Sequence, residues 1–324
     1  MKRIIIPITV AFALFCVCGE AGAEDRPETV EGITPENYPR VDGSTSTEPL
    51  NTLIACKLLG WQYEWRPFLA GNGVWQLLPR GETMPEDFFG NRVKTSQTHN
   101  AFLNLIDGGA DIVLSARKMS DEERAYAESA DVEVIETPVA LDALDFLVNS
   151  QNPVRSLTAA QVRDIYLRNL VNWREAGGAD GDIRPFIRNP QSGSQEMMKE
   201  IVMNRAGMPD WEAGFDDDVL PTMALVYREV ADNLHGICFT PHYYREYIIR
   251  DAVGADRTKT VAIEGVYPDA RSIGDKTYPF VAPVYAVVRA DADRLSMTGR
   301  LYDWLRTEAG KAVIAESGYV PTEA

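Results

Sequence analysis

The chain has 324 residues, of which 45% are hydrophobic and 25% are charged, and its formal net charge is −16. This length is sufficient for two packed domains of ordinary size. The acidic balance excludes neither an enzyme nor a binding protein, but it argues against a protein that binds nucleic acid or an anionic membrane.

Residues 1–23 have the three parts of a secretory signal peptide. A basic start at Lys2 and Arg3 precedes an apolar run that ends at Cys18, and small residues follow at positions 21–23. The residues before Cys16 and Cys18 do not form a lipobox. We therefore predict cleavage after residue 23 and a protein that is periplasmic or otherwise exported, and soluble after cleavage.

Cleavage would remove a net charge of +1 and leave −17, together with two cysteines, Cys56 and Cys238. Two cysteines exclude a disulfide-rich scaffold and a CxxC metal or redox site. One disulfide and two separate buried thiols both remain possible, because the sequence does not give the distance between their Cα atoms. No metal and no cofactor is predicted.

The first structured segment follows a polar leader at residues 24–39. Residues 40–42 predict a short strand, and the hydroxyl-rich segment 43–49 leads into a helical pattern at positions 50, 53, 54 and 58. Thr45 and Glu48 have the spacing of a capping box, and Pro49 suits a first helical turn. Residues 60–92 are rich in aromatic residues and glycine, and we predict a helix end followed by an elaborated loop.

A second segment of the same kind begins at residue 94. Residues 94–100 are polar and lead into a helix with Ala101, Phe102, Leu105 and Ile106 on one face, ended by Gly108 and Gly109. Residues 111–115 then predict a buried strand. Residues 120–123 open another helix with acidic residues in its first turn, where the helix dipole favours them.

The third segment, residues 188–195, has the features of an anion-binding site. Ser192 and Gln195 have capping-box spacing, Gly193 lets a ligand approach the backbone, and Arg188 adds a fork of donors. The helix that follows has an apolar pattern at positions 197, 198, 201 and 202 and is expected to stop at residues 207–209. An ordinary capped surface helix is the alternative.

Strands and helices that alternate in this way predict mainly parallel sheets. In such sheets ligands bind outside the carboxyl ends of the strands. The three helix starts rich in Ser and Thr could therefore face one cleft.

Three sequence motifs together resemble the periplasmic phosphate-binding protein family of ABC transporters. They are the run from Asp42 to Thr47, the run from Asp107 to Ile112, and the run from Ser192 to Gln195, and the similarity extends over most of residues 40–245. The resemblance implies a two-lobed α/β periplasmic binding protein of type II, the Venus-flytrap fold, with crossover strands near residues 140–148 and 280–288. Lobe one would comprise residues 40–140 and 286–324, and lobe two residues 141–285.

The resemblance also implies the ligand, the partners and the site. The ligand would be inorganic phosphate, and the partners would be the membrane permease subunits of an ABC transporter. The family's anion contacts fall on the following residues: Thr45, Ser46, Thr98, Arg188, Ser192, Gly193 and Ser194.

One departure from the family concerns the proton acceptor. Well-known members have a Ser-Asp pair after the buried strand, where this chain has Ser115, Ala116 and Arg117. Arg117 is a candidate ligand, since a planar bidentate donor suits an oxyanion, and a salt bridge to a local acid such as Asp121 is the alternative. We favour a hidden acceptor supplied by another acid, for which the nearest candidates in sequence are Asp42 and Asp145.

Other functions find less support in the sequence, and no catalytic residue is predicted. His99 could act as a base for Ser96 or Thr98, but a local hydrogen bond at a helix start is the commoner role. The aromatic residues Trp173, Trp211, Tyr243 and Tyr244 could form a sugar platform or belong to the core. A phosphate-sensing or surface interaction protein on the same fold is the second hypothesis.

Overall fold

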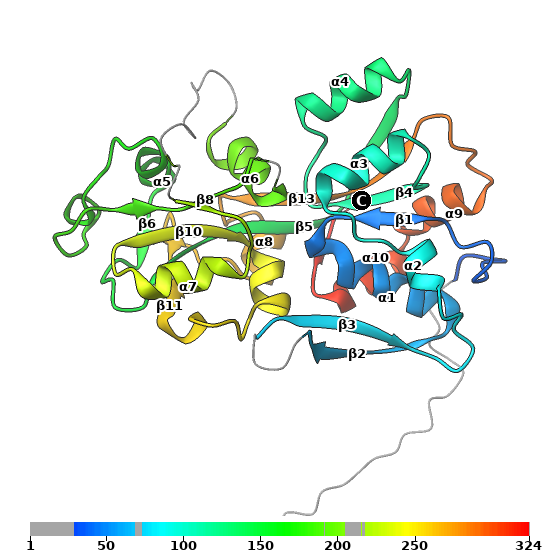
Figure 1. The fold of residues 1–324 in the computed structure, drawn as a ribbon, viewed down its shortest axis with the longest axis horizontal. Coiled ribbons are helices and arrows are strands. Elements are labelled where there is room, and N and C mark those ends of the chain that lie inside the picture. Colours follow the sequence, from blue (N-terminus) through cyan, green and yellow to red (C-terminus); the bar gives the residue numbers. More distant parts are fainter. Residues whose placement is uncertain (1–28, 69–72, 191, 205–214, 216–217, 324) are drawn as a thin grey trace, which may run out of the picture.

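The computed structural model describes residues 29–68, 73–190, 192–204, 215 and 218–323. These residues form two lobes that are joined by long strands (Figure 1). Lobe one carries α1 (Glu48–Leu59) and α3 (Thr98–Ile106), and lobe two carries α5 (Ala159–Tyr166) and α6 (Gly193–Met197). The predicted two-lobed α/β fold is confirmed, whereas the exact lobe bounds stay a prediction.

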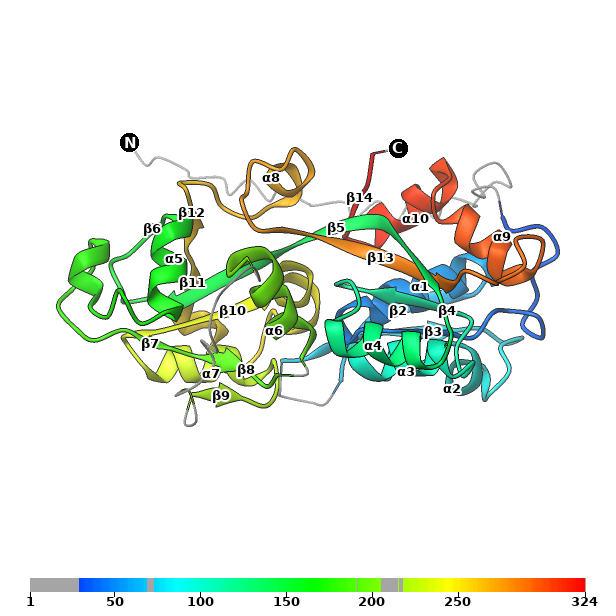
Figure 2. The same ribbon diagram turned by 90° about the horizontal axis from the view of Figure 1, so that it is seen from above.

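Two neighbouring strands pass between the lobes. They are β5 (Val134–Asn149) and β13 (Val281–Arg289), which run antiparallel and side by side along the molecule (Figure 2). β13 also pairs with β4 (Ile112–Ser115) in lobe one, and β5 also pairs with β10 (Gly236–Pro241) in lobe two. One sheet therefore continues through both lobes, in the order β1-β4-β13-β5-β10-β7.

The prediction of mainly parallel sheets is wrong. The parallel pairs are β1 (Val41–Gly43) with β4, β7 (Arg184–Pro185) with β10, β6 (Ser156–Leu157) with β12 (Ala262–Ile263), and β8 (Ile187–Arg188) with β9 (Val219–Leu220). The antiparallel pairs of the large sheet join β5 and β13 to each other and to β4, β10, β11 (Thr258–Thr260) and β14 (Val320–Pro321). The β5–β13 pair is antiparallel because the chain leaves lobe one along β5 and returns along β13.

Lobe one packs its helices around a core that includes the leader. Val30 and Tyr38 are both buried in this core, so the prediction of a loose leader is wrong for the residues that the structure describes. The Tyr38 ring meets the edge of the Phe88 ring with centroids 5.4 Å apart. The remaining helices of this lobe are α2 (Phe88–Arg92), α4 (Asp121–Ser129), α9 (Met297–Trp304), α10 (Glu308–Ser317) and the 3-10 helix Thr45–Thr47.

The segment predicted as an elaborated loop forms a hairpin. Its strands are β2 (Gln62–Pro67) and β3 (Trp75–Arg80), which pair in antiparallel register. Trp75 Nε1 donates a hydrogen bond to Asp251 Oδ2 at 2.7 Å, and Arg250 lies over the Trp75 ring at 4.2 Å. The hairpin of lobe one therefore also contacts lobe two.

Lobe two has an aromatic core, with Phe146 between Tyr166 and Phe239. Its helical segment at residues 193–202 begins as α6 and continues as a π-helix over Met198–Val202, and the predicted stop at residues 207–209 lies outside the described residues. The other helical segments are α7 (Leu225–Asp232), α8 (Ala270–Gly274), the 3-10 helices Trp173–Ala176 and Ala255–Arg257, and the π-helix Tyr244–Ile248.

Two other predictions concern the cysteines and the membrane. Cys56 and Cys238 are buried free thiols, which decides between the two possibilities left open by the sequence. The predicted signal peptide lies outside the described residues. Among the residues that the structure does describe, no helix is both long and apolar enough to cross a membrane.

Candidate functional site

The three predicted helix starts meet at one cavity of about 250 Å³ between the lobes. Figure 1 shows α6 at the edge of lobe two that faces α3 and β1 of lobe one. The cavity is lined by Ser44, Thr45, Ser46, Gln97, Thr98, Ala116, Arg188, Asn189, Ser192, Gly193, Ser194, Met197, Pro221, Thr222, Met223, Pro241 and Tyr244. All the predicted site residues except Arg117 are among them.

Arg188 is the charged residue of this lining. It ends the short strand β8, and its backbone N–H donates to Gln195 Oε1 at 2.9 Å, which ties the strand to α6. Its side chain is buried, with Nε donating to the Leu220 carbonyl at 3.1 Å and Nη2 donating to Asn189 Oδ1 at 3.3 Å. Nη1 is buried and has no hydrogen-bond partner among the described residues.

A buried donor on a charged group is costly to leave unpaired. Burial lowers the pKa of Arg188 to about 10, so the guanidinium is still charged at neutral pH. The described residues offer it no carboxylate, and an anion in the cavity would supply both the missing charge and the missing acceptor. Arg188 therefore has the burial and the unpaired donor that an anion contact requires.

The start of α6 presents hydroxyls and backbone N–H groups to the same cavity. The Ser192 hydroxyl caps the helix by accepting a hydrogen bond from the Gln195 N–H at 3.3 Å, and it lies 2.8 Å from the Ser194 hydroxyl. The Gln195 side chain binds the Arg188 N–H instead of completing the predicted capping box. Gly193 stands at the first helical position, where backbone N–H groups point out of the helix start toward the cavity and can bind an anion.

In lobe one the loop after β1 is organised around Ser44. The Ser44 hydroxyl accepts hydrogen bonds from Thr98 Oγ1 at 3.0 Å and from the Ala116 N–H at 3.2 Å. The predicted Thr45–Glu48 capping box does not form, because a 3-10 turn at Thr45–Thr47 precedes α1. Thr45 and Ser46 thereby line the cavity from the first turn of this helical segment.

Several lining residues were missed by the sequence analysis. Gln97 has φ 69 and ψ 159, a conformation that is rare outside glycine and that often marks a functional site. Thr222 and Met223 reach the cavity from a segment that carries no recognisable motif, and Tyr244, predicted only as part of a sugar platform or of the core, lines it too. Burial raises the pKa of Tyr244 to about 12, so it is a neutral hydroxyl in the site.

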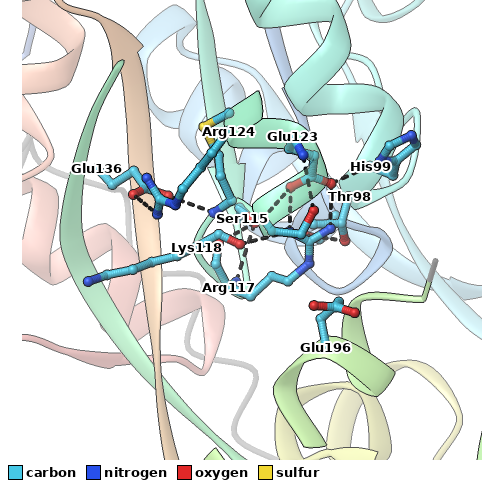
Figure 3. A network of polar contacts seen from close by, with 12 residues as sticks. Thr98, His99, Ser115, Arg117, Lys118, Glu123, Arg124, Glu136 and Glu196 are labelled. Carbon is cyan, nitrogen blue, oxygen red and sulfur yellow. Dashed lines mark hydrogen bonds and ion pairs between the residues drawn. The ribbon is translucent and has the colours of Figure 1, made fainter. Parts of the chain in front are cut away.

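Arg117 is placed elsewhere, contrary to its prediction as a ligand. Its Nη1 and Nη2 donate to the two carboxylate oxygens of Glu123 at 2.7 and 2.8 Å, and both side chains are buried (Figure 3). It lines a second cavity with His99 and Glu196. The partner is Glu123 and not Asp121 because Glu123 is the third residue of α4, where it also closes the capping box with Ser120.

The two acids favoured as hidden acceptors do not line the cavity either. Asp42 is buried and accepts hydrogen bonds from the Gly43 and Ser96 N–H groups at 2.8 and 2.9 Å and from Asn104 Nδ2 at 2.7 Å. Asp145 Oδ2 binds Arg245 at 2.6 Å and His242 at 3.0 Å. Each carboxylate is held by its own structural partners, so the hidden-acceptor prediction is wrong for both.

The residues that suggested an enzyme or a sugar site have other roles. His99 Nδ1 lies 3.0 Å from Glu123 Oε1, at the Arg117 salt bridge. Trp173 and Tyr243 are buried in the cores of the protein, and Trp211 lies outside the described residues. Of this group Tyr244 alone lines the cavity, among the described residues.

A family model described as a PBP superfamily domain matches residues 87–314. Protein SphX of Synechococcus elongatus is 26% identical over 278 residues, which cover 80% of this chain and 79% of that protein. The phosphate-binding protein PstS of Pseudomonas aeruginosa is 24% identical over 235 residues, which cover 68% of this chain and 70% of that protein.

A solved structure shares the same fold. It is that of an ABC-type phosphate transport receptor from Vibrio cholerae, which matches with a TM-score of 0.60 at 20% identity. The match covers 87% of this chain and 98% of the Vibrio protein. The two-lobed fold is therefore common to both chains.

Proposed function

Since the chain belongs to the PBP superfamily, whose family model matches residues 87–314, we propose that it binds inorganic phosphate in the cavity between its lobes. The single observation that carries the proposal is Arg188, a buried cation whose Nη1 has no hydrogen-bond partner among the described residues. A tetrahedral oxyanion placed there would accept from Arg188 and from the hydroxyls and N–H groups of both lobes.

The contacts proposed for phosphate come from both sides of the cavity. Thr45, Ser46 and Thr98 would contact the anion from lobe one, and Arg188, Ser192, Gly193 and Ser194 from lobe two. Because these groups belong to separate lobes, one ligand can hold the lobes together. This role is binding without catalysis.

The proposal extends to transport. The protein would be exported and would deliver phosphate to the permease subunits of an ABC importer. The names of the similar proteins support this part, since they include a phosphate-binding protein and a phosphate transport receptor. A strain that lacks the gene should take up labelled phosphate more slowly, and restoring the gene should restore uptake.

Calorimetric titration of the exported protein, stripped of bound phosphate beforehand, tests the binding step. We expect saturable binding at one site and a higher melting temperature with phosphate, because a ligand that binds only the folded state stabilises it. Absence of both binding heat and a melting shift at millimolar phosphate would remove the basis of the proposal.

A further inference from the structure

The lining of the interlobe cavity has an unusual balance of groups for a site that takes a protonated ligand. Among the described residues that line it, Arg188 is the sole charged side chain and no carboxylate is present. The other polar groups are hydroxyls and the amides of Gln97 and Asn189. The described lining therefore carries one positive charge and offers no carboxylate as a hydrogen-bond acceptor.

The acids around this lining are held by other groups or do not line the cavity. Asp42 accepts three hydrogen bonds from groups of lobe one, and Asp145 is bound by Arg245 and His242. Glu48 begins α1 close enough to Tyr244 for its charge to help raise the pKa of that hydroxyl, but it does not line the cavity, and Glu196 lines the neighbouring cavity with Arg117. Because these partners hold Asp42 and Asp145 in place, neither carboxylate can accept a hydrogen bond from the ligand without breaking contacts of the fold.

We infer that this cavity selects its ligand by tetrahedral shape and double negative charge, so that sulfate binds alongside phosphate. The inference rests on the proposed function and names the ligand class of the same site. Monohydrogen phosphate and sulfate are both tetrahedral dianions, and they differ in one proton. A carboxylate would accept that proton from phosphate and repel the bare oxygen of sulfate. Hydroxyls and amides can present either a hydrogen or a lone pair, so they tolerate both ligands.

A consequence follows for the dependence on pH. Tyr244 is neutral because burial raises its pKa to about 12, and Arg188 stays charged because its pKa is about 10. The lining itself therefore does not titrate near neutral pH, and the ligand does. Phosphate carries more negative charge as pH rises, and a positive cavity without a carboxylate binds the more highly charged form better.

Ala116 offers the matched test of this inference. It is buried beside the Ser44 hydroxyl, lines the cavity and follows the buried strand β4. Ala116→Asp would place a carboxylate at the cavity, and Ala116→Asn would place a neutral side chain of the same size there. A comparison of these two variants separates the charge of the new group from its bulk.

The experiment is calorimetric titration of the exported wild-type protein and both variants with phosphate and with sulfate. For the wild type we expect sulfate affinity within about tenfold of phosphate affinity, since no buried acceptor is left facing a bare oxygen. We also expect phosphate affinity to rise from about pH 5.5 to about pH 8, across the second ionisation of a phosphate group. Ala116→Asp should weaken the binding of sulfate more than the binding of phosphate. Ala116→Asn should not change the ratio of the two affinities.

The outcomes distinguish this inference from the proposed function. If the wild type binds phosphate but its affinity for sulfate is lower by a factor of about 10⁴ or more, the inference is overturned and the proposed function stands. A fall in phosphate affinity with rising pH would do the same, because it would reveal a carboxylate acceptor in the site. If neither anion binds at millimolar concentration, both the inference and the proposed function are wrong. The wild-type titrations decide these outcomes even if Ala116→Asp does not fold.

Discussion

The hydroxyl oxygen of Thr98 lies 2.7 Å from the position that a β-carbon on Gly193 would occupy. Thr98 begins α3 in lobe one, and Gly193 begins α6 in lobe two. The two helix starts thus approach each other across the cavity more closely than any other residue type at position 193 would allow. A side chain at position 193 would therefore press on the Thr98 hydroxyl.

Gly193→Ala is expected to weaken phosphate binding by about tenfold. The new methyl group would press on Thr98, and relieving that contact would move one helix start. Overpacking of this kind costs on the order of 1–3 kcal/mol. Calorimetry measures the change. Gly90→Ala is the matched control, since a β-carbon at Gly90 would have no neighbour within 4 Å. Wild-type affinity in both variants would show that the closed spacing of the helices does not matter for binding.

Arg117 and Glu123 should contribute to the stability of the fold and not to phosphate binding. Removing one member of a buried ion pair leaves the other charge uncompensated, so Glu123→Ala is expected to lower the free energy of unfolding by about 3–5 kcal/mol. Arg117→Met combined with Glu123→Leu should recover most of this loss. Urea denaturation measures the stability of each variant.

Phosphate affinity of the double variant is the critical readout for Arg117. We expect it to stay within a few-fold of the wild type, since Arg117 lies at the second cavity. A loss of phosphate affinity as large as that caused by removing Arg188 would instead make Arg117 a ligand.

Asp142 should make stability depend on pH. Burial raises the pKa of this carboxyl to about 6, although the charge of His242 and the N–H groups of Tyr243 and Ala143 act in the opposite direction. The protonated form is thus favoured in the folded state. Its contribution to stability is complete below the ordinary pKa of 3.8 and is lost as pH rises through about 6.

Asp142→Asn removes this dependence. The free energy of unfolding of the variant minus that of the wild type should increase by on the order of 1–3 kcal/mol as pH rises from about 4 to about 8. Urea denaturation at both pH values gives the comparison, with the exposed Asp256→Asn as control. A stability difference that does not change with pH would mean that Asp142 is ionised in the folded protein throughout this range.

Local sequence patterns predicted much of lobe one. The apolar spacing of Ala101, Phe102, Leu105 and Ile106 predicted α3, and the apolar run at 111–115 predicted β4, because periodicity reports which face of an element is buried. The hairpin β2–β3 was missed since its aromatic residues lack strict alternation and its strands are half exposed. The directions of β5 and β13 were missed because they follow from the path of the chain between lobes, which no local pattern records.

The sequence predicted the part of the site that is formed by the starts of helices. Capping residues and glycine mark a helix start in the sequence, so Ser192 and Thr98 could be found. Arg117 was wrongly predicted as a ligand because the sequence does not distinguish an arginine that binds an anion from one that forms a salt bridge. The structure shows the salt bridge to Glu123. Thr222 and Met223 were missed because they reach the cavity through tertiary structure alone.

The most direct test of the account is the phosphate affinity of Arg188→Ala, measured by calorimetry on folded protein. Arg184→Ala is the matched control, because Arg184 lies four residues earlier on the same lobe and pairs with Asp218 at 2.7 Å away from the cavity lining. We predict that Arg188→Ala weakens phosphate binding by about a hundredfold or more, corresponding to a loss of about 3 kcal/mol or more, while Arg184→Ala binds like the wild type. Equal affinity in Arg188→Ala and the wild type, with both shown to be folded, would contradict the assignment of the anion site.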